Sequence, residues 1–98
     1  MKINIQSVKF DADKKLLDFV RQKVTKLLQV HDEIIGVEVI LRLENVQDEG
    51  NKIAEIILNI PGNNLFAKKQ SKTFEEAIDG AVDALRRQLK KQKDKLRK

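Results

Sequence analysis

Apolar and polar residues alternate along much of this chain, which is the pattern of strands with one buried face. The alternating stretches are Lys2–Val8, Val37–Glu44 and Lys52–Ile60, and a short fourth strand is expected over Asn64–Gln70. Turn-forming residues at Gln47–Asn51 separate the second and third stretches, so these two should form an antiparallel hairpin. Pro61-Gly62-Asn63 predicts the turn into the last strand, because Pro fixes φ and Gly or Asn accepts a positive φ.

Two other stretches repeat apolar residues three and four positions apart, which predicts amphipathic helices. The first helix should begin after Asp11 or Asp13, either of which can cap it, and run to about Val30. The second should begin after Thr73, which forms a capping box with Glu76. The apolar positions are Leu16, Phe19, Val20, Val24, Leu27 and Leu28 in the first, and Phe74, Ala77, Ile78, Ala81, Val82, Leu85 and Leu89 in the second.

The predicted order of elements is therefore βαβββα. Two helices of this kind need one face of a sheet to cover, so the expected fold class is α+β, a two-layer domain with a four-stranded sheet and two helices on one face. Ninety-eight residues leave room for a single domain over residues 1–98. Gly80 costs about 1 kcal/mol in the middle of a helix, and close packing of helix on sheet explains it.

Several classes of function find no support in the composition. The chain has no cysteine, which excludes a disulfide framework and a thiolate nucleophile, and His31, the one histidine, is expected to have a structural role at a helix end. No catalytic or phosphate-loop motif occurs, so we expect no enzyme, no catalytic residue, no cofactor and no metal. The N-terminus lacks a signal-peptide pattern and no stretch is long and apolar enough to span a membrane, which predicts a cytoplasmic protein.

Positive charge is concentrated at the C-terminal end of the second predicted helix. Residues 86–98 hold eight of the 20 bases but one of the 15 acids, which leaves twelve bases against fourteen acids before them. Two or three bases would suffice to complement a helix dipole, so eight point to a polyanionic partner. Nucleic acid is favoured, with an anionic membrane or an acidic protein groove as alternatives. Without Trp or Tyr, recognition through phosphates and shape fits better than base stacking.

The second predicted helix also resembles a known family, the ribosome hibernation promoting factors, which include ribosome-associated inhibitors and proteins once described as sigma-factor modulators. The first predicted helix resembles that of the family through Phe19-Val20, Lys23 and Lys26-Leu27, and the βαβββα order is the family's order. The residues that carry the resemblance in the second are Ala77-Ile78-Asp79-Gly80, Val82-Asp83, Leu85, Arg87-Gln88-Leu89, Lys91 and Lys93-Asp94-Lys95-Leu96.

The resemblance implies a short hibernation factor, monomeric off the ribosome, that occupies the small ribosomal subunit near the decoding centre. There it would block the sites of messenger and transfer RNA and silence translation in starved or stationary cells. Residues matching the family's motif would contact ribosomal RNA; these are Lys23, Lys26, Arg87, Lys91, Lys93 and Lys95. Arg86 and Lys90 join them on charge and proximity.

An alternative hypothesis is a protein-interaction module. In this interpretation Leu85, Leu89 and Leu96 form part of a seam for a partner helix, while the bases lie outside it. The seam is short, since Leu89 to Leu96 spans one heptad.

Overall fold

The computed structural model describes residues 2–29, 31, 33–44 and 50–96, with side chains described as far as Lys91. The elements follow the predicted order βαβββα, and their ends differ from the prediction by one or two residues. The strands are β1 (Lys2–Val8), β2 (Gly36–Leu43), β3 (Lys52–Asn59) and β4 (Leu65–Ser71), and the helices are α1 (Lys14–Leu28) and α2 (Phe74–Leu96).

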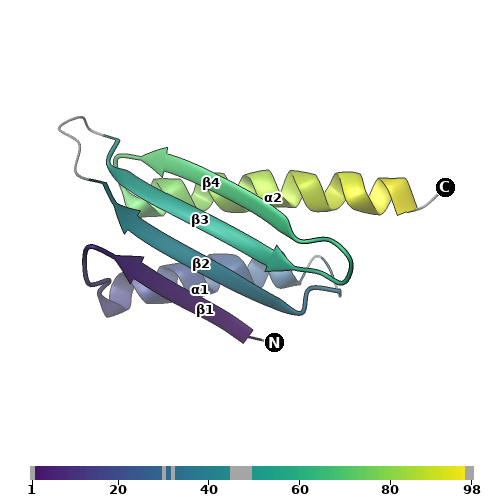
Figure 1. The fold of residues 1–98 in the computed structure, drawn as a ribbon, viewed down its shortest axis with the longest axis horizontal. Coiled ribbons are helices and arrows are strands. Elements are labelled where there is room, and N and C mark those ends of the chain that lie inside the picture. The colour runs from purple at the N-terminus through teal and green to yellow at the C-terminus, as the bar shows by residue number, and fades with distance from the viewer. Residues whose placement is uncertain (1, 30, 32, 45–49, 97–98) are drawn as a thin grey trace.

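The four strands form one sheet in the order β1-β2-β3-β4 (Figure 1). β2 and β3 pair antiparallel, which confirms the predicted hairpin, and β4 continues the antiparallel pattern. β1 instead pairs parallel to β2, with α1 as the connection between them. The sheet is therefore mixed, and its two edges are β1 and β4.

The structure describes the predicted turn before β4 and the two ends of the predicted β2–β3 turn. Gly62 has a φ of +81°, and the Asn63 N–H donates to the Ile60 carbonyl at 3.1 Å, so the predicted turn before β4 is confirmed. At the β2–β3 hairpin, the Glu44 N–H donates to the Asn51 carbonyl at 2.9 Å. The predicted turn residues 47–49 lie outside the described part of the chain.

Both helices begin at side-chain caps. Of the two predicted candidates, Asp13 caps α1, and its Oδ1 accepts a hydrogen bond of 2.8 Å from the Leu16 N–H. Thr73 Oγ1 accepts from the Glu76 N–H at 3.1 Å, which is the first half of the predicted capping box. α1 ends at Leu28, earlier than the predicted end near Val30, which is itself outside the described residues.

The core lies between the sheet and the two helices, which cover the same face in Figure 1. α2 packs against β3, β4 and α1. The largest fully buried side chains are Leu27, Leu41, Ile56, Leu58, Ile78, Leu85 and Leu89. Gly80 confirms the predicted close packing, because a Cβ at this position would lie 3.2 Å from Cγ of Lys69 on β4.

α2 is longer than the sheet that supports it. Its 23 residues extend roughly 34 Å at 1.5 Å per residue, whereas the 7 residues of β4 reach roughly 23 Å. Figure 1 shows the C-terminal turns of α2 continuing past the ends of the strands. These turns belong to the basic segment, so the fold presents that segment beyond the edge of the core.

Candidate nucleic-acid interface

Burial of one side of α2 determines where its bases point. Leu85 and Leu89 are fully buried in the core, and the described bases of this stretch are all exposed. These bases are Arg86, Arg87, Lys90 and Lys91. Because successive residues of a helix are 100° apart, anchoring every third or fourth residue inward leaves the charges between them in water. These four side chains therefore face solvent.

Lys23 comes from α1 and reaches α2. Its Nζ lies 3.1 Å from Oδ1 of Asp79, and 5.5 Å from the centre of the Phe19 ring, one turn earlier in α1. The side chain keeps 33% of its surface exposed. Lys23 is therefore held between the helices by an ion pair and an aromatic face while its ammonium remains accessible to a ligand.

A shallow hollow on the outer surface brings together three of the predicted bases. We call it the interhelical hollow; it is lined by Lys23, Lys26, Asp79, Val82, Asp83 and Arg86. Lys90 follows Arg86 by four residues, so it lies on the same side of α2 one turn further along. Two segments far apart in the sequence thus contribute to one basic surface.

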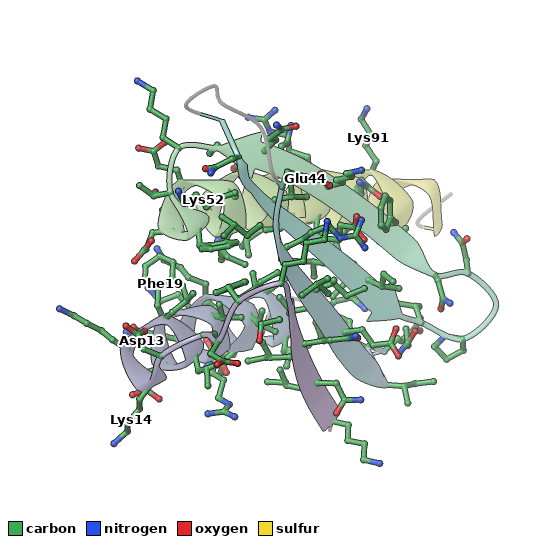
Figure 2. All side chains as sticks on the ribbon, turned by 60° about the vertical axis from the view of Figure 1, so that its left-hand side comes forward. Asp13, Lys14, Phe19, Glu44, Lys52 and Lys91 are labelled. Atoms are coloured by element: carbon green, nitrogen blue, oxygen red, sulfur yellow. The ribbon has the colours of Figure 1, made fainter. Side chains whose placement is uncertain are left out.

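The remaining predicted bases extend this surface along α2. The Arg87 guanidinium lies 2.8 Å from the Asp83 carboxylate at i,i+4 spacing, and the Arg87 side chain is 78% exposed. Figure 2 shows Lys91 directed away from α2. Lys93 and Lys95 fall within α2, but their side chains lie outside the described residues. A ligand on this surface would meet bases from α1 and, among the described side chains of α2, bases as far as Lys91.

Two carboxylates among these bases were not predicted as part of the site. Asp79 pairs with Lys23, and Asp83 pairs with Arg87. The i,i+4 spacing of Asp83 and Arg87 in a predicted helix was a signal that could have found the second pair. No spacing in the sequence could have indicated the contact between Lys23 and Asp79, because that contact depends on how α1 and α2 pack together.

His31 has a local role at the end of α1. Its Nδ1 accepts a hydrogen bond of 3.2 Å from the Glu33 N–H, two residues on. Over the described residues, no three or more metal-ligating side chains gather into a group that could hold an ion. Neither helix, in the same part of the chain, has an apolar stretch suited to crossing a membrane.

The predicted leucine seam for a partner helix is wrong at two of its three positions. Leu85 and Leu89 are 0% and 1% exposed, because both pack in the protein's own core. The third position, Leu96, has a side chain outside the described residues. A partner helix could not reach the two leucines without unpacking α2 from the sheet.

Comparison with known proteins agrees with the resemblance of the helices. Residues 3–97 match the family model described as Sigma 54 modulation protein / S30EA ribosomal protein. A ribosome hibernation promoting factor of Klebsiella oxytoca is 36% identical over 97 residues, covering 99% of this chain and 98% of that protein. The protein of the same name from Escherichia coli strain K12 is 35% identical with the same coverage.

Solved structures share the fold over nearly the whole chain. A ribosomal subunit interface protein from Coxiella burnetii superposes with a TM-score of 0.83 at 22% identity, covering 96% of this chain and 99% of that one. The N-terminal domain of Thermus thermophilus Protein Y gives a TM-score of 0.78 at 26% identity, covering 93% and 98%. Because the family model and the full-length relatives agree, the chain belongs to the Sigma 54 modulation protein / S30EA ribosomal protein family, that of the ribosome hibernation promoting factors.

Proposed function

We propose that this protein is a ribosome hibernation factor that binds the small ribosomal subunit near the decoding centre and inhibits translation there. The observation that carries the proposal is the convergence of Lys23 and Lys26 from α1 with Arg86 from α2 at the interhelical hollow. The names of the full-length relatives support the ribosome as partner. Ribosomes that translate lie in the cytoplasm, which is where the protein would act.

Electrostatics supply the attraction in this proposal. Each base that neutralises a phosphate releases condensed counterions, and this release favours binding without reading sequence. The proposed contacts to ribosomal RNA are Lys23, Lys26, Arg86, Arg87, Lys90, Lys91, Lys93 and Lys95. Asp79 and Asp83 would give up Lys23 and Arg87 to phosphates, since both ion pairs are partly or largely exposed and therefore weak.

Inhibition follows from occupancy. A folded domain anchored by two helices would fill space that messenger and transfer RNA otherwise take, so binding of the protein and of these RNAs would be mutually exclusive. The mechanism needs no turnover and no cofactor. Its residues contribute binding, orientation and bulk.

Competition in a cell-free translation reaction tests the proposal. Inhibition should shrink when initiator tRNA and message are bound to the small subunit before the protein is added, because prebound ligands exclude it. Washing the ribosomes at high salt should then restore full activity with ribosomal RNA intact. Inhibition that is indifferent to prebound tRNA and message would reject the occlusion mechanism, and cleaved ribosomal RNA would indicate an enzyme.

A further inference from the structure

Three of the four phenylalanines of this protein already have an aromatic or cationic partner. Phe10 and Phe74 stack on each other, with ring centres 4.5 Å apart and planes 13° from parallel. Phe19 has the Lys23 ammonium over its ring. Phe66 is 50% exposed and is, with Ile35, one of the two large apolar side chains exposed in the described part of the chain.

Phe66 lies on the edge strand β4, directly beside the basic segment of α2. Its carbonyl accepts a hydrogen bond of 3.1 Å from Nε2 of Gln88, a residue of that segment. Lys91 follows Gln88 by three residues and is exposed, so it occupies the same side of α2 one turn further along. The packing of α2 on β4 thus fixes Phe66 next to the bases that the proposed function assigns to RNA.

The ring faces away from the helices. Ala67, the next residue of β4, is buried in the core, and strand residues alternate in direction, so Phe66 projects from the sheet face that α1 and α2 leave open. Its cross-strand neighbour Ile57 is half-buried. Lys68, two residues on and on the same face, is 52% exposed and lies 3.8 Å from Glu55, a separation at the outer limit of an ion pair. An aromatic ring backed by an aliphatic side chain therefore lies beside Lys68 on the open face of the sheet, while Lys91 lies on α2, on the same side of that helix as the Gln88 that contacts the Phe66 backbone.

We propose that Phe66 stacks on an unpaired RNA base while Lys68 and Lys91 contact the adjacent phosphates. This inference rests on the proposed function and extends its surface from the helices to the edge of the sheet. Proteins bind single-stranded RNA with aromatic rings and nearby cations, because every base has a π face and every nucleotide carries a phosphate. Bases inside a duplex are excluded from such a contact because both their faces are already stacked.

Other binding partners fit the surface around Phe66 less well than an RNA base does. Strand addition to β4 is blocked at Phe66, because the carbonyl that a new strand would use already accepts from Gln88. A protein partner would need an apolar area far larger than Phe66 and the half-buried Ile57, whose surroundings are Lys68, Glu55 and Gln88. A single base can be covered by one aromatic ring.

The absence of Trp and Tyr from the sequence provides a direct test. Phe66→Trp would carry the protein's one indole, and stacking on a base quenches indole fluorescence. The variant is titrated to saturation with octa-adenylate RNA, and in parallel with an abasic octamer of the same charge. A dye on the RNA reports binding through fluorescence anisotropy. We expect quenching by octa-adenylate and none by the abasic chain. Equal responses to the two, or no binding of octa-adenylate, would overturn the stacking proposal.

Ile35→Trp is the matched control, because Ile35 is 62% exposed but precedes β2, which is separated from β4 by β3 in the sheet. Its fluorescence should not change with either octamer. Quenching at both positions would indicate collisions with RNA in general and would also overturn the proposal.

Affinity for the small subunit tests the same contact in its proposed setting. Phe66→Ala and Phe66→Leu should each weaken binding by about 5- to 150-fold, the effect of removing one base–aromatic stack. Phe66→Trp keeps an aromatic face and should recover most of that loss, while Ile35→Ala should bind like the wild type. Wild-type affinity in Phe66→Leu would mean that apolar bulk suffices and would reject stacking. Failure of the unmodified protein to bind would instead reject the proposed function itself.

Discussion

The ammonium of Lys23 on α1 lies 3.1 Å from the carboxylate of Asp79 on α2, so an ion pair joins the two helices at the interhelical hollow. The side chains are 33% and 54% exposed, and pairs this exposed to solvent contribute about 0–1 kcal/mol to stability. The pair therefore contributes little to folding. In the proposed function, Asp79 neutralises a base at the place where a phosphate would bind.

Replacing Asp79 by Asn should tighten binding to unrelated RNA, because the change removes a negative charge beside Lys23 and repulsion from phosphate falls. The free energy of unfolding should change by less than about 1 kcal/mol. Filter binding to polyuridylate at low salt measures the first effect, and urea unfolding the second. Asp11→Asn removes an equal charge from the segment before α1 and serves as the control. Weaker binding by Asp79→Asn than by this control would show that Asp79 positions Lys23 for RNA rather than masking it.

Affinity for the small subunit should fall steeply with salt. Neutralising about six phosphates predicts a slope of roughly −4 to −5 for the logarithm of the binding constant against the logarithm of salt concentration, on the estimate for single strands. Sedimentation of the protein with purified subunits over a range of potassium chloride concentrations gives the slope. A slope near zero between low and physiological salt would rule out phosphate contacts as the source of affinity.

Replacing Arg87, Lys91, Lys93 and Lys95 together by Gln should separate function from fold. Arg87 and Lys91 are exposed, and exposed substitutions usually change stability by less than about 0.5 kcal/mol each. The circular dichroism spectrum and melting curve should therefore stay near those of the wild type, while ribosome binding drops by orders of magnitude.

The matched control for this variant removes four other exposed bases, none of which lines the interhelical hollow. They are Lys2, Lys14, Lys15 and Arg21. The control should lose much less affinity, since it changes net charge by the same amount at other places. Equal losses in the two variants would show that net charge alone attracts the ribosome.

Gly80→Ala should raise the free energy of unfolding by up to about 1 kcal/mol, the helix-propensity difference between the two residues. The new Cβ would lie 3.2 Å from Cγ of Lys69, but Lys69 is exposed on an edge strand and can move by the few tenths of an ångström required. Urea unfolding of the two proteins measures the difference. A destabilised variant would mean that the Lys69 side chain is held in place.

Local patterns were sufficient to predict the elements of this fold. Alternation in β2 and β3, together with turn-forming residues between them, identified the hairpin because both signals come from neighbouring residues. The apolar repeat of α2 likewise predicted that Leu85 and Leu89 face the core. Such features depend on the period of a helix or strand, which a sequence displays directly.

Features that depend on packing between distant segments could not be obtained this way. The sequence Lys2–Val8 does not indicate that β1 pairs parallel to β2, because the same alternation of apolar and polar residues occurs in parallel and antiparallel strands. The contact of Lys23 with Asp79 and the position of Phe66 beside Gln88 join residues far apart in the sequence. The lack of Trp and Tyr suggested little base stacking, but one exposed Phe is enough for the contact proposed above.

Because the C-terminal turns of α2 extend beyond the sheet, ionic strength should have two opposing effects on this protein. Arg87, Lys91 and Lys95 follow one another at four-residue intervals, and like charges at this spacing destabilise a helix by about 0.2–0.5 kcal/mol per pair. Added salt screens that repulsion, so it should favour the helix while weakening attraction to a polyanion. In dilute buffer both the repulsion among these bases and their attraction to phosphates are strongest, and a bound polyanion would supply the neutralisation that dissolved ions otherwise provide.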